Sequence, residues 1–288
     1  MDPATYCQNR ATQQGTSLYY SLLFLPEPQR RAATALYAYQ KEIVGIVAEC
    51  SDLGVAQTKL QWWQEEITRL FTGHPRHPVT QSLATPIRSY HLPQQSFLEV
   101  IEGVSSDLGQ WTYPSFQTLI SYCQQVAGII SSMAAEIYGY QDPKTRQYAK
   151  NLGVALQLTH ILRNIRQDAA QGRIYLPREE FTRFKVPVED ILSGGSDNSQ
   201  GMATLLAQHA SRARQYFHSA LAELGQRDYY AQRAGLTQIA LGLSLLNAIE
   251  EEGYPVLKQR ISLTPLRKLW IAWRTSHRAR RGLAPQYQ

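Results

Sequence analysis

Apolar residues recur every three or four positions along most of the chain, which is the spacing of amphipathic helices. Runs that alternate apolar and polar residues, as half-buried strands do, do not occur. Proline and glycine separate the periodic segments, so each segment is predicted to be a separate helix. The predicted helices cover 30–50, 55–72, 115–139, 145–168, 200–224 and 230–252, and further helices begin at or near Pro78, Pro93 and Pro187.

Two stretches interrupt the helical pattern. Residues 172–177 predict a non-helical excursion, and residues 193–199 form a Gly- and Ser-rich stretch that resembles a linker. This stretch is too short to indicate a second domain, and no internal repeat is visible. The sequence therefore predicts an all-α protein in which residues 1–288 form a single domain, a bundle of about ten helices around a shared interior. Bundle interiors are common ligand sites.

The composition is that of an ordinary globular protein, with 288 residues, 43% hydrophobic and 18% charged. Its three cysteines, Cys7, Cys50 and Cys123, are too few and too scattered for a disulfide framework or a zinc site. We expect a reducing compartment for this reason. The sequence shows neither a signal peptide nor an apolar run of the ~20 residues that span a bilayer. The expected location is cytoplasmic.

The formal net charge of +6 is concentrated near the C-terminus. From Arg260 to Arg281 there are seven basic residues, no acidic residue, and several Leu and Trp residues between them. This basic amphipathic segment, at about 258–281, has two open interpretations. It makes peripheral contact with the inner face of the cytoplasmic membrane, or it is a final helix with its apolar side on the core. No recognition motif accompanies the charge, so nucleic acid is not an expected partner.

Several short motifs occur along the chain in a fixed order. They are found at 17–26, 30–39, 59–63, 77–80, 157–159, 161–163, 172–177 and 262–270. Through these motifs the chain resembles the squalene/phytoene synthase family from about residue 5 to 275. It is most similar to the bacterial hopanoid-pathway branch, which makes presqualene diphosphate from two farnesyl diphosphates. The resemblance implies an isoprenoid (terpenoid) synthase-like helical bundle that encloses a central cavity.

The resemblance also implies a magnesium site between two aspartate-rich motifs on facing helices, where the metal stabilises the diphosphate leaving group. In the first motif the three aspartates are replaced by Val44, Gly45 and Ala48, whose side chains cannot ligate a cation. Glu49 lies four residues after Gly45 and therefore on the same helical face. Glu49 is either a remaining metal ligand or a carboxylate on the helix surface.

The second motif corresponds to residues 160–168 and has also lost carboxylates. Asn164 offers only a neutral carbonyl oxygen where the family has an aspartate, and Asp168 remains. A lone histidine such as His160 is usually a hydrogen-bonded core residue, although it can ligate a softer metal. If a metal binds here, Asp168 and Glu49 are its predicted ligands.

The positions that would hold diphosphate have changed as well. Gln124-Gln125 and Gly242-Leu243 stand where the resemblance implies Tyr-Arg pairs. Arginine suits a diphosphate because its planar fork of donors stays charged, so these changes remove ligand contacts.

Four candidates for binding a ligand or a diphosphate persist. They are Tyr19, Arg163, Arg173 and Tyr175. The alternative for the two arginines is that they pair with Asp168.

Three functions stay open at this stage. The pattern of losses favours a protein that has lost magnesium-dependent condensation and acts in binding, scaffolding or assembly. Its expected partner is an active synthase paralogue or a membrane-associated complex, and no cofactor is expected. The second is an active prenyltransferase of the presqualene diphosphate, squalene or phytoene synthase type with an altered metal site, which needs Mg²⁺. The third is a carrier that holds a neutral isoprenoid or lipid in its apolar cavity.

Overall fold

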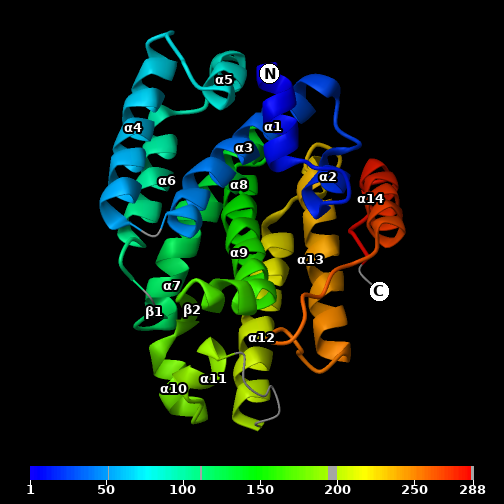
Figure 1. The fold of residues 1–288 in the computed structure, drawn as a ribbon. Coiled ribbons are helices and arrows are strands. Elements are labelled where there is room, and N and C mark those ends of the chain that lie inside the picture. The colour runs from blue at the N-terminus through cyan, green and yellow to red at the C-terminus, as the bar shows by residue number, and fades with distance from the viewer. Residues whose placement is uncertain (51, 111, 194–199, 287–288) are drawn as a thin grey trace.

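The computed structural model describes residues 1–50, 52–110, 112–193 and 200–286, apart from the side chain of residue 48, and within them nearly all regular secondary structure is helical (Figure 1). The N-terminal half forms α1 (Pro3–Ala11), α2 (Ser17–Leu22), α3 (Glu27–Glu49), α4 (Leu53–Phe71), α5 (Pro78–Ser89), α6 (Gln94–Ser106), α7 (Phe116–Cys123) and α8 (Ile129–Tyr138). The C-terminal half forms α9 (Thr145–Ala170), α10 (Arg178–Phe184), α11 (Val188–Leu192), α12 (Gln200–Glu223), α13 (Arg233–Glu251) and α14 (Pro265–Arg280). The predicted all-α class is confirmed.

Local sequence signals set many helix starts. The Asp2 carboxylate accepts a hydrogen bond from the Thr5 amide at 3.0 Å, and the Asp52 carboxylate accepts one from the Val55 amide at 2.9 Å. Each bond satisfies an amide that has no partner within the first turn of its helix. Helix α5 begins at Pro78, as predicted, because proline needs no amide partner in a first turn.

The segment 115–139 is not the single helix that its periodicity predicts. Helices α7 and α8 are joined by a π-helical turn, Gln124–Gly128. At this turn α9 approaches so closely that a Cβ on Gly153 would overlap the backbone carbonyl of Ala127. The close packing of α9 against the turn has no signature in the periodicity, which reports only which face of a segment is apolar.

The predicted non-helical excursion is confirmed and forms a short strand. Strand β2 (Ile174–Pro177) pairs in parallel with β1 (Thr112–Tyr113), which precedes α7. The strand pair joins the end of α9 to the start of α7. Of the linker-like stretch, residues 194–199 lie outside the described residues.

Two helices lie at the centre of the packing. Helix α9 packs on α8, α12 and α13, and α13 is buried on nearly all of its sides from Arg233 to Leu246. Helix α3 packs against α1, α5 and α8, while α14 lies at the outside against α13 and α2 (Figure 1, red). Within the described residues, no helix is both long enough and apolar enough to cross a bilayer.

Candidate functional site

The first motif lies near the C-terminal end of α3, and an arginine from α1 packs onto it. Val44 and Gly45 are half-buried, and the side chain of Ala48 lies outside the description. Arg10 places its Nε 2.9 Å from Oε1 of Glu42 and its Nη2 3.1 Å from Oε1 of Glu49. A Cβ on Gly45 would lie 3.0 Å from the same Nη2. Glu49, whose side chain is 59% exposed, is therefore one of two carboxylates that pair with Arg10.

The second motif, on α9, is organised by a buried amide. Nδ2 of Asn164 lies 2.8 Å from Nε2 of His160, so the amide donates to a neutral imidazole. Oδ1 of Asn164 accepts from Nε of Arg163 at 3.4 Å and from Nε of Arg260 at 3.3 Å. Both ends of the Asn164 amide are thus engaged by the protein itself.

Arg163 and Arg260 meet at this amide, and two lysines lie close enough to both guanidinium groups to feel their charge. We call the four the cation cluster: Lys41, Arg163, Arg260 and Lys268. Burial, together with Arg10, Arg163 and Arg260, lowers the pKa of Lys41. Burial and the charge of Arg260 lower the pKa of Arg163 to about 10, and burial, Arg163 and Arg260 lower the pKa of Lys268. Like charges shift each other in this way when they lie close together.

None of these four side chains forms an ion pair with a carboxylate in the part of the chain that the structure describes. Nζ of Lys268 donates to the backbone carbonyl of Gly15 at 2.8 Å, which positions the charge without neutralising it. A cluster of this kind creates a positive potential that attracts anions.

His160 lies beside the cation cluster and is neutral. Burial, with the charges of Arg163, Arg260 and Lys41, lowers the pKa of His160 to about 3. The residue keeps accessible surface although protein surrounds its ring. The prediction of a hydrogen-bonded histidine is confirmed, but His160 is not a member of the hydrophobic core, since it keeps accessible surface.

Asp168 belongs to a second group farther along α9, centred on Asp107 at the end of α6. The Asp107 carboxylate accepts hydrogen bonds from the hydroxyls of Tyr113 at 2.5 Å and Tyr175 at 3.0 Å, and its Oδ2 lies 3.3 Å from Nη1 of Arg173. Burial and the Asp107 charge raise the pKa of Asp168 to about 7, against the opposing charge of Arg173. The ion pair of Arg173 is therefore with Asp107 and not with Asp168.

The residues present do not fit the magnesium site that the resemblance implies. Val44 and Gly45 carry no donor, and the oxygen of Asn164 already faces two guanidinium groups. Throughout the described residues no set of three or more His, Cys, Asp or Glu side chains is placed to hold a metal ion. Magnesium needs several hard oxygen ligands, so we assign no metal to this site.

At Gly242-Leu243, where the resemblance implies a Tyr-Arg pair, core side chains occupy the space. A Cβ on Gly242 would overlap the ring of Phe217 from α12, a side chain without accessible surface. Leu243 is 3% exposed and belongs to the hydrophobic core. The space beside Gly242 is therefore occupied by Phe217.

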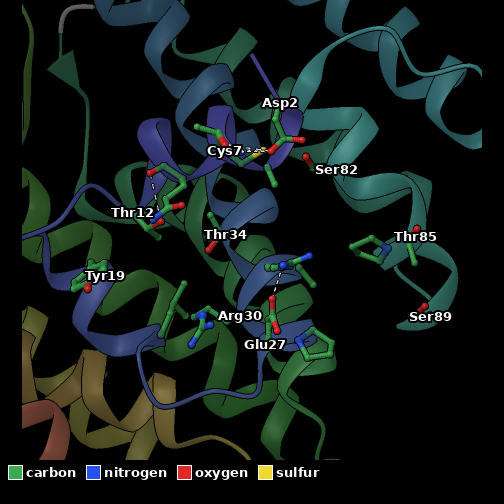
Figure 2. A pocket seen from close by; sticks show the side chains of 18 of the residues that line it. Asp2, Cys7, Thr12, Tyr19, Glu27, Arg30, Thr34, Ser82, Thr85 and Ser89 are labelled. Atoms are coloured by element: carbon green, nitrogen blue, oxygen red, sulfur yellow. Dashed lines mark hydrogen bonds and ion pairs between the residues drawn. The ribbon is translucent and has the colours of Figure 1, made fainter.

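Tyr19 lies in a different place from the other candidates. It lines a pocket of about 1260 Å³ between α1, α2, α3 and α5, together with Arg30 and Thr34 (Figure 2). Thr34 precedes Val44 by ten residues, or about 15 Å along α3. A smaller hollow of about 230 Å³ is lined by Arg163, Asn164 and Arg260. We place the candidate site at this smaller hollow because the unpaired charges lie there.

Sequence reasoning missed Lys41, Arg260 and Lys268 as parts of a site. Lys41 lies three residues before Val44 and so on the same helical face, a signal that helical spacing alone supplies. Arg260 and Lys268 read only as members of the basic C-terminal segment. Asp107 carries no signal in the sequence, because its partners come from β1 and β2.

Comparisons with known proteins agree on one family. Residues 11–267 match the family described as squalene/phytoene synthase. The 15-cis-phytoene synthase of Synechococcus elongatus is 30% identical over 275 residues, covering 91% of this chain and 89% of the relative. The phytoene synthase of Mycobacterium tuberculosis is 30% identical over 257 residues, covering 89% of this chain and 84% of the relative.

Solved structures show the same fold. Squalene synthase HpnC from Alicyclobacillus acidocaldarius superposes with a TM-score of 0.74 at 25% identity, covering 88% of this chain and 94% of HpnC. A dehydrosqualene synthase in complex with ligand superposes with a TM-score of 0.82 at 21% identity, covering 97% of each chain. The predicted isoprenoid synthase-like bundle is confirmed, and the hopanoid branch stays a prediction.

Proposed function

Because the chain belongs to the squalene/phytoene synthase family, we propose that it is a non-catalytic member that binds a prenyl diphosphate without magnesium. The observation that carries this proposal is the cation cluster around Asn164, which has no carboxylate partner among the described residues. In an enzyme of this family, the resemblance implies, carboxylates and metal ions bind the diphosphate as well. Here Arg163 and Arg260 of the cluster line the hollow and can accept a diphosphate directly.

Binding by fixed cations does not by itself produce turnover. Condensation requires stronger stabilisation of the departing diphosphate in the transition state than in the bound substrate. Val44 and Gly45 carry no metal ligand, so the described side chains of the first motif hold no magnesium ion that could stabilise the departing diphosphate. The expected result is an occupied site and an intact ligand.

Turnover is the direct test of the proposal. Purified protein is mixed with farnesyl diphosphate, excess magnesium and reduced nicotinamide cofactor, and pyrophosphate release is followed. The control is the phytoene synthase of Synechococcus elongatus with its own substrate. We expect release from the control only, while calorimetry shows saturable binding of farnesyl diphosphate to this protein in the presence of EDTA. Magnesium-dependent release by this protein would establish the active alternative instead.

Charge-removing variants locate the binding site. Lys41→Gln or Arg260→Gln should each weaken the binding of farnesyl diphosphate about tenfold or more, since a hydrogen bond from a charged donor contributes about 1.5–3 kcal/mol. Lys144→Gln, which removes an exposed charge before α9, serves as the matched control and should leave the affinity unchanged. Equal affinity in all three variants would mean that the ligand binds elsewhere.

The carrier alternative has less support, since Phe217 fills the space that the loss of a Tyr-Arg pair at Gly242-Leu243 would open. An active paralogue or a membrane-associated complex as partner stays a prediction, as does a role in scaffolding or assembly.

A further inference from the structure

Helix α14 has an apolar stripe on its outer face. Four of its large side chains are exposed, and together they form what we call the outer stripe: Leu266 (80% exposed), Leu269 (40%), Trp270 (56%) and Trp273 (45%). At 3.6 residues per turn these positions fall within an arc of about 100°. The rings of Trp270 and Trp273 stack with centroids 5.0 Å apart, and Trp273 stacks on His277 at 5.6 Å.

The opposite face of α14 already packs on the protein. Ile271, Ala272, Thr275 and Ala279 are buried, and the helix contacts α13 and α2. A surface helix normally presents polar residues opposite its buried face. If α14 only packed its apolar side on the core, the buried face would be explained, but the outer stripe would have no partner among the described residues.

Basic side chains flank the outer stripe on one side. Arg267, Arg274 and Arg278, which we call the arginine row, lie at about 80–120° from Leu266 around the helix. Helix α14 contains no aspartate or glutamate, and Arg280 and Arg281 add exposed charges at its end. The outer face of α14 is thus apolar along one line and cationic along the next.

We propose that α14 docks the protein on an anionic membrane surface. The outer stripe enters the headgroup region, where tryptophan is favoured, and the arginine row binds lipid phosphates. We choose an anionic membrane as the partner because the only charges beside the tryptophan rings on this face are positive. Helix α14 lies at the edge of the molecule (Figure 1).

The inner side of the same helix supports this assignment. Lys268 of the cation cluster lies on α14, with its Nζ on the Gly15 carbonyl. Docking through the outer stripe therefore places the membrane on one side of α14 and the candidate site on the other. The docking proposal does not depend on whether that site binds a diphosphate.

Vesicle flotation of the full chain tests the proposal. We expect the protein to float with vesicles of phosphatidylcholine mixed with phosphatidylglycerol, and to bind vesicles of phosphatidylcholine alone much more weakly. High salt should weaken the anionic binding, because exposed charges are screened. Trp270→Ser/Trp273→Ser should reduce partitioning about tenfold or more, and Arg267→Gln/Arg274→Gln should reduce it about fivefold per arginine.

Matched variants make the test specific to α14. Trp62→Ser removes a tryptophan of similar exposure from α4, and Lys144→Gln/Lys150→Gln removes two exposed charges at the start of α9. Both controls should float like the wild type, and circular dichroism should show the same helix content in every variant. Flotation that is lost equally in the controls would overturn the proposal. A wild type that binds neither kind of vesicle at low salt would also overturn it, leaving an acidic protein surface as the occupant of α14.

Discussion

The side-chain oxygen of Asn164 lies 3.3 Å from Nε of Arg260, and this contact joins the second motif on α9 to the segment that follows α13. The same oxygen faces Arg163 at 3.4 Å. An amide can accept from both guanidinium groups without neutralising either one. The resemblance implies an aspartate at this position. With an amide in its place, the charges of Arg163 and Arg260 are not neutralised, so the site is more positive.

Asn164→Asp should reverse that change in part. The new carboxylate would sit between Arg163 and Arg260 and neutralise one of their charges, so we expect the affinity for pyrophosphate to fall about tenfold. Calorimetry in EDTA measures this affinity. Asn247→Asp is the matched control, because Asn247 also accepts from an arginine, Arg214 at 3.1 Å, but lies away from the site. A fall of equal size in both variants would contradict a local cause.

Ligand binding should raise the pKa of His160. The pKa of His160 is held at about 3 by burial and by Arg163, Arg260 and Lys41, and an anion on the cation cluster offsets the effect of these charges. Nuclear magnetic resonance of the imidazole during a pH titration, with and without pyrophosphate, measures the change. An unchanged pKa at saturating pyrophosphate would place the anion elsewhere.

The same histidine makes stability fall toward acid pH. Its folded-state pKa of about 3 lies below the unfolded value of about 6.5, so the unfolded state binds the proton first. The contribution of His160 is complete above about pH 6.5 and is lost as the pH falls toward 3. His160→Gln should flatten this part of the stability profile in urea unfolding, and His74→Gln, at an exposed position, should not.

The effect of Asp168 on stability should have the opposite dependence on pH. Its folded-state pKa of about 7 lies above its ordinary value of about 3.8, so the native state keeps a proton that the unfolded state has lost. Stability therefore falls as the pH rises from about 4 to about 7. Asp168→Asn should be more stable than the wild type above this window, by on the order of a few kcal/mol. Urea unfolding on both sides of the window checks the sign, and equal differences at both pH values would contradict it.

Two glycines within helices should respond in opposite ways to alanine. Gly242→Ala should destabilise the protein by about 1–3 kcal/mol, because its Cβ meets the buried ring of Phe217. Gly45→Ala should be neutral or stabilising by up to ~1 kcal/mol, because the atoms near its Cβ are the ends of the flexible Arg10 and Glu49 side chains. Denaturant midpoints compare the two variants. A loss at Gly45 as large as that at Gly242 would mean that Arg10 cannot move.

Helix positions were largely predictable because their causes are local. The end of α4 before Thr72-Gly73 and the start of α5 at Pro78 follow from turn and first-turn chemistry that adjacent residues supply. The division of segment 115–139 was not predictable, since it occurs where α9 packs against the chain at Gly153.

Of the candidate site, the sequence predicted only which metal ligands are missing. The substitutions at Val44, Gly45 and Asn164 are visible in the chain, and they predicted that metal ligands would be missing. The ion pair of Glu49 with Arg10 was not visible, because Arg10 comes from α1, some 39 residues earlier. The ion pair of Arg173 with Asp107 was not visible either. The sequence predicted that Arg173 would pair with Asp168 or bind a ligand.

The sequence by itself determined the helical class, most helix boundaries and the carboxylates that are absent, because periodicity, caps and residue identity are properties of neighbouring positions. Only the tertiary structure decided which charges meet. Lys41 comes from α3, Arg163 from α9, Arg260 from the segment after α13, and Lys268 from α14. The strength of their mutual repulsion, and hence the attraction for an anion, depends on separation and burial, which exist only once these segments are packed together.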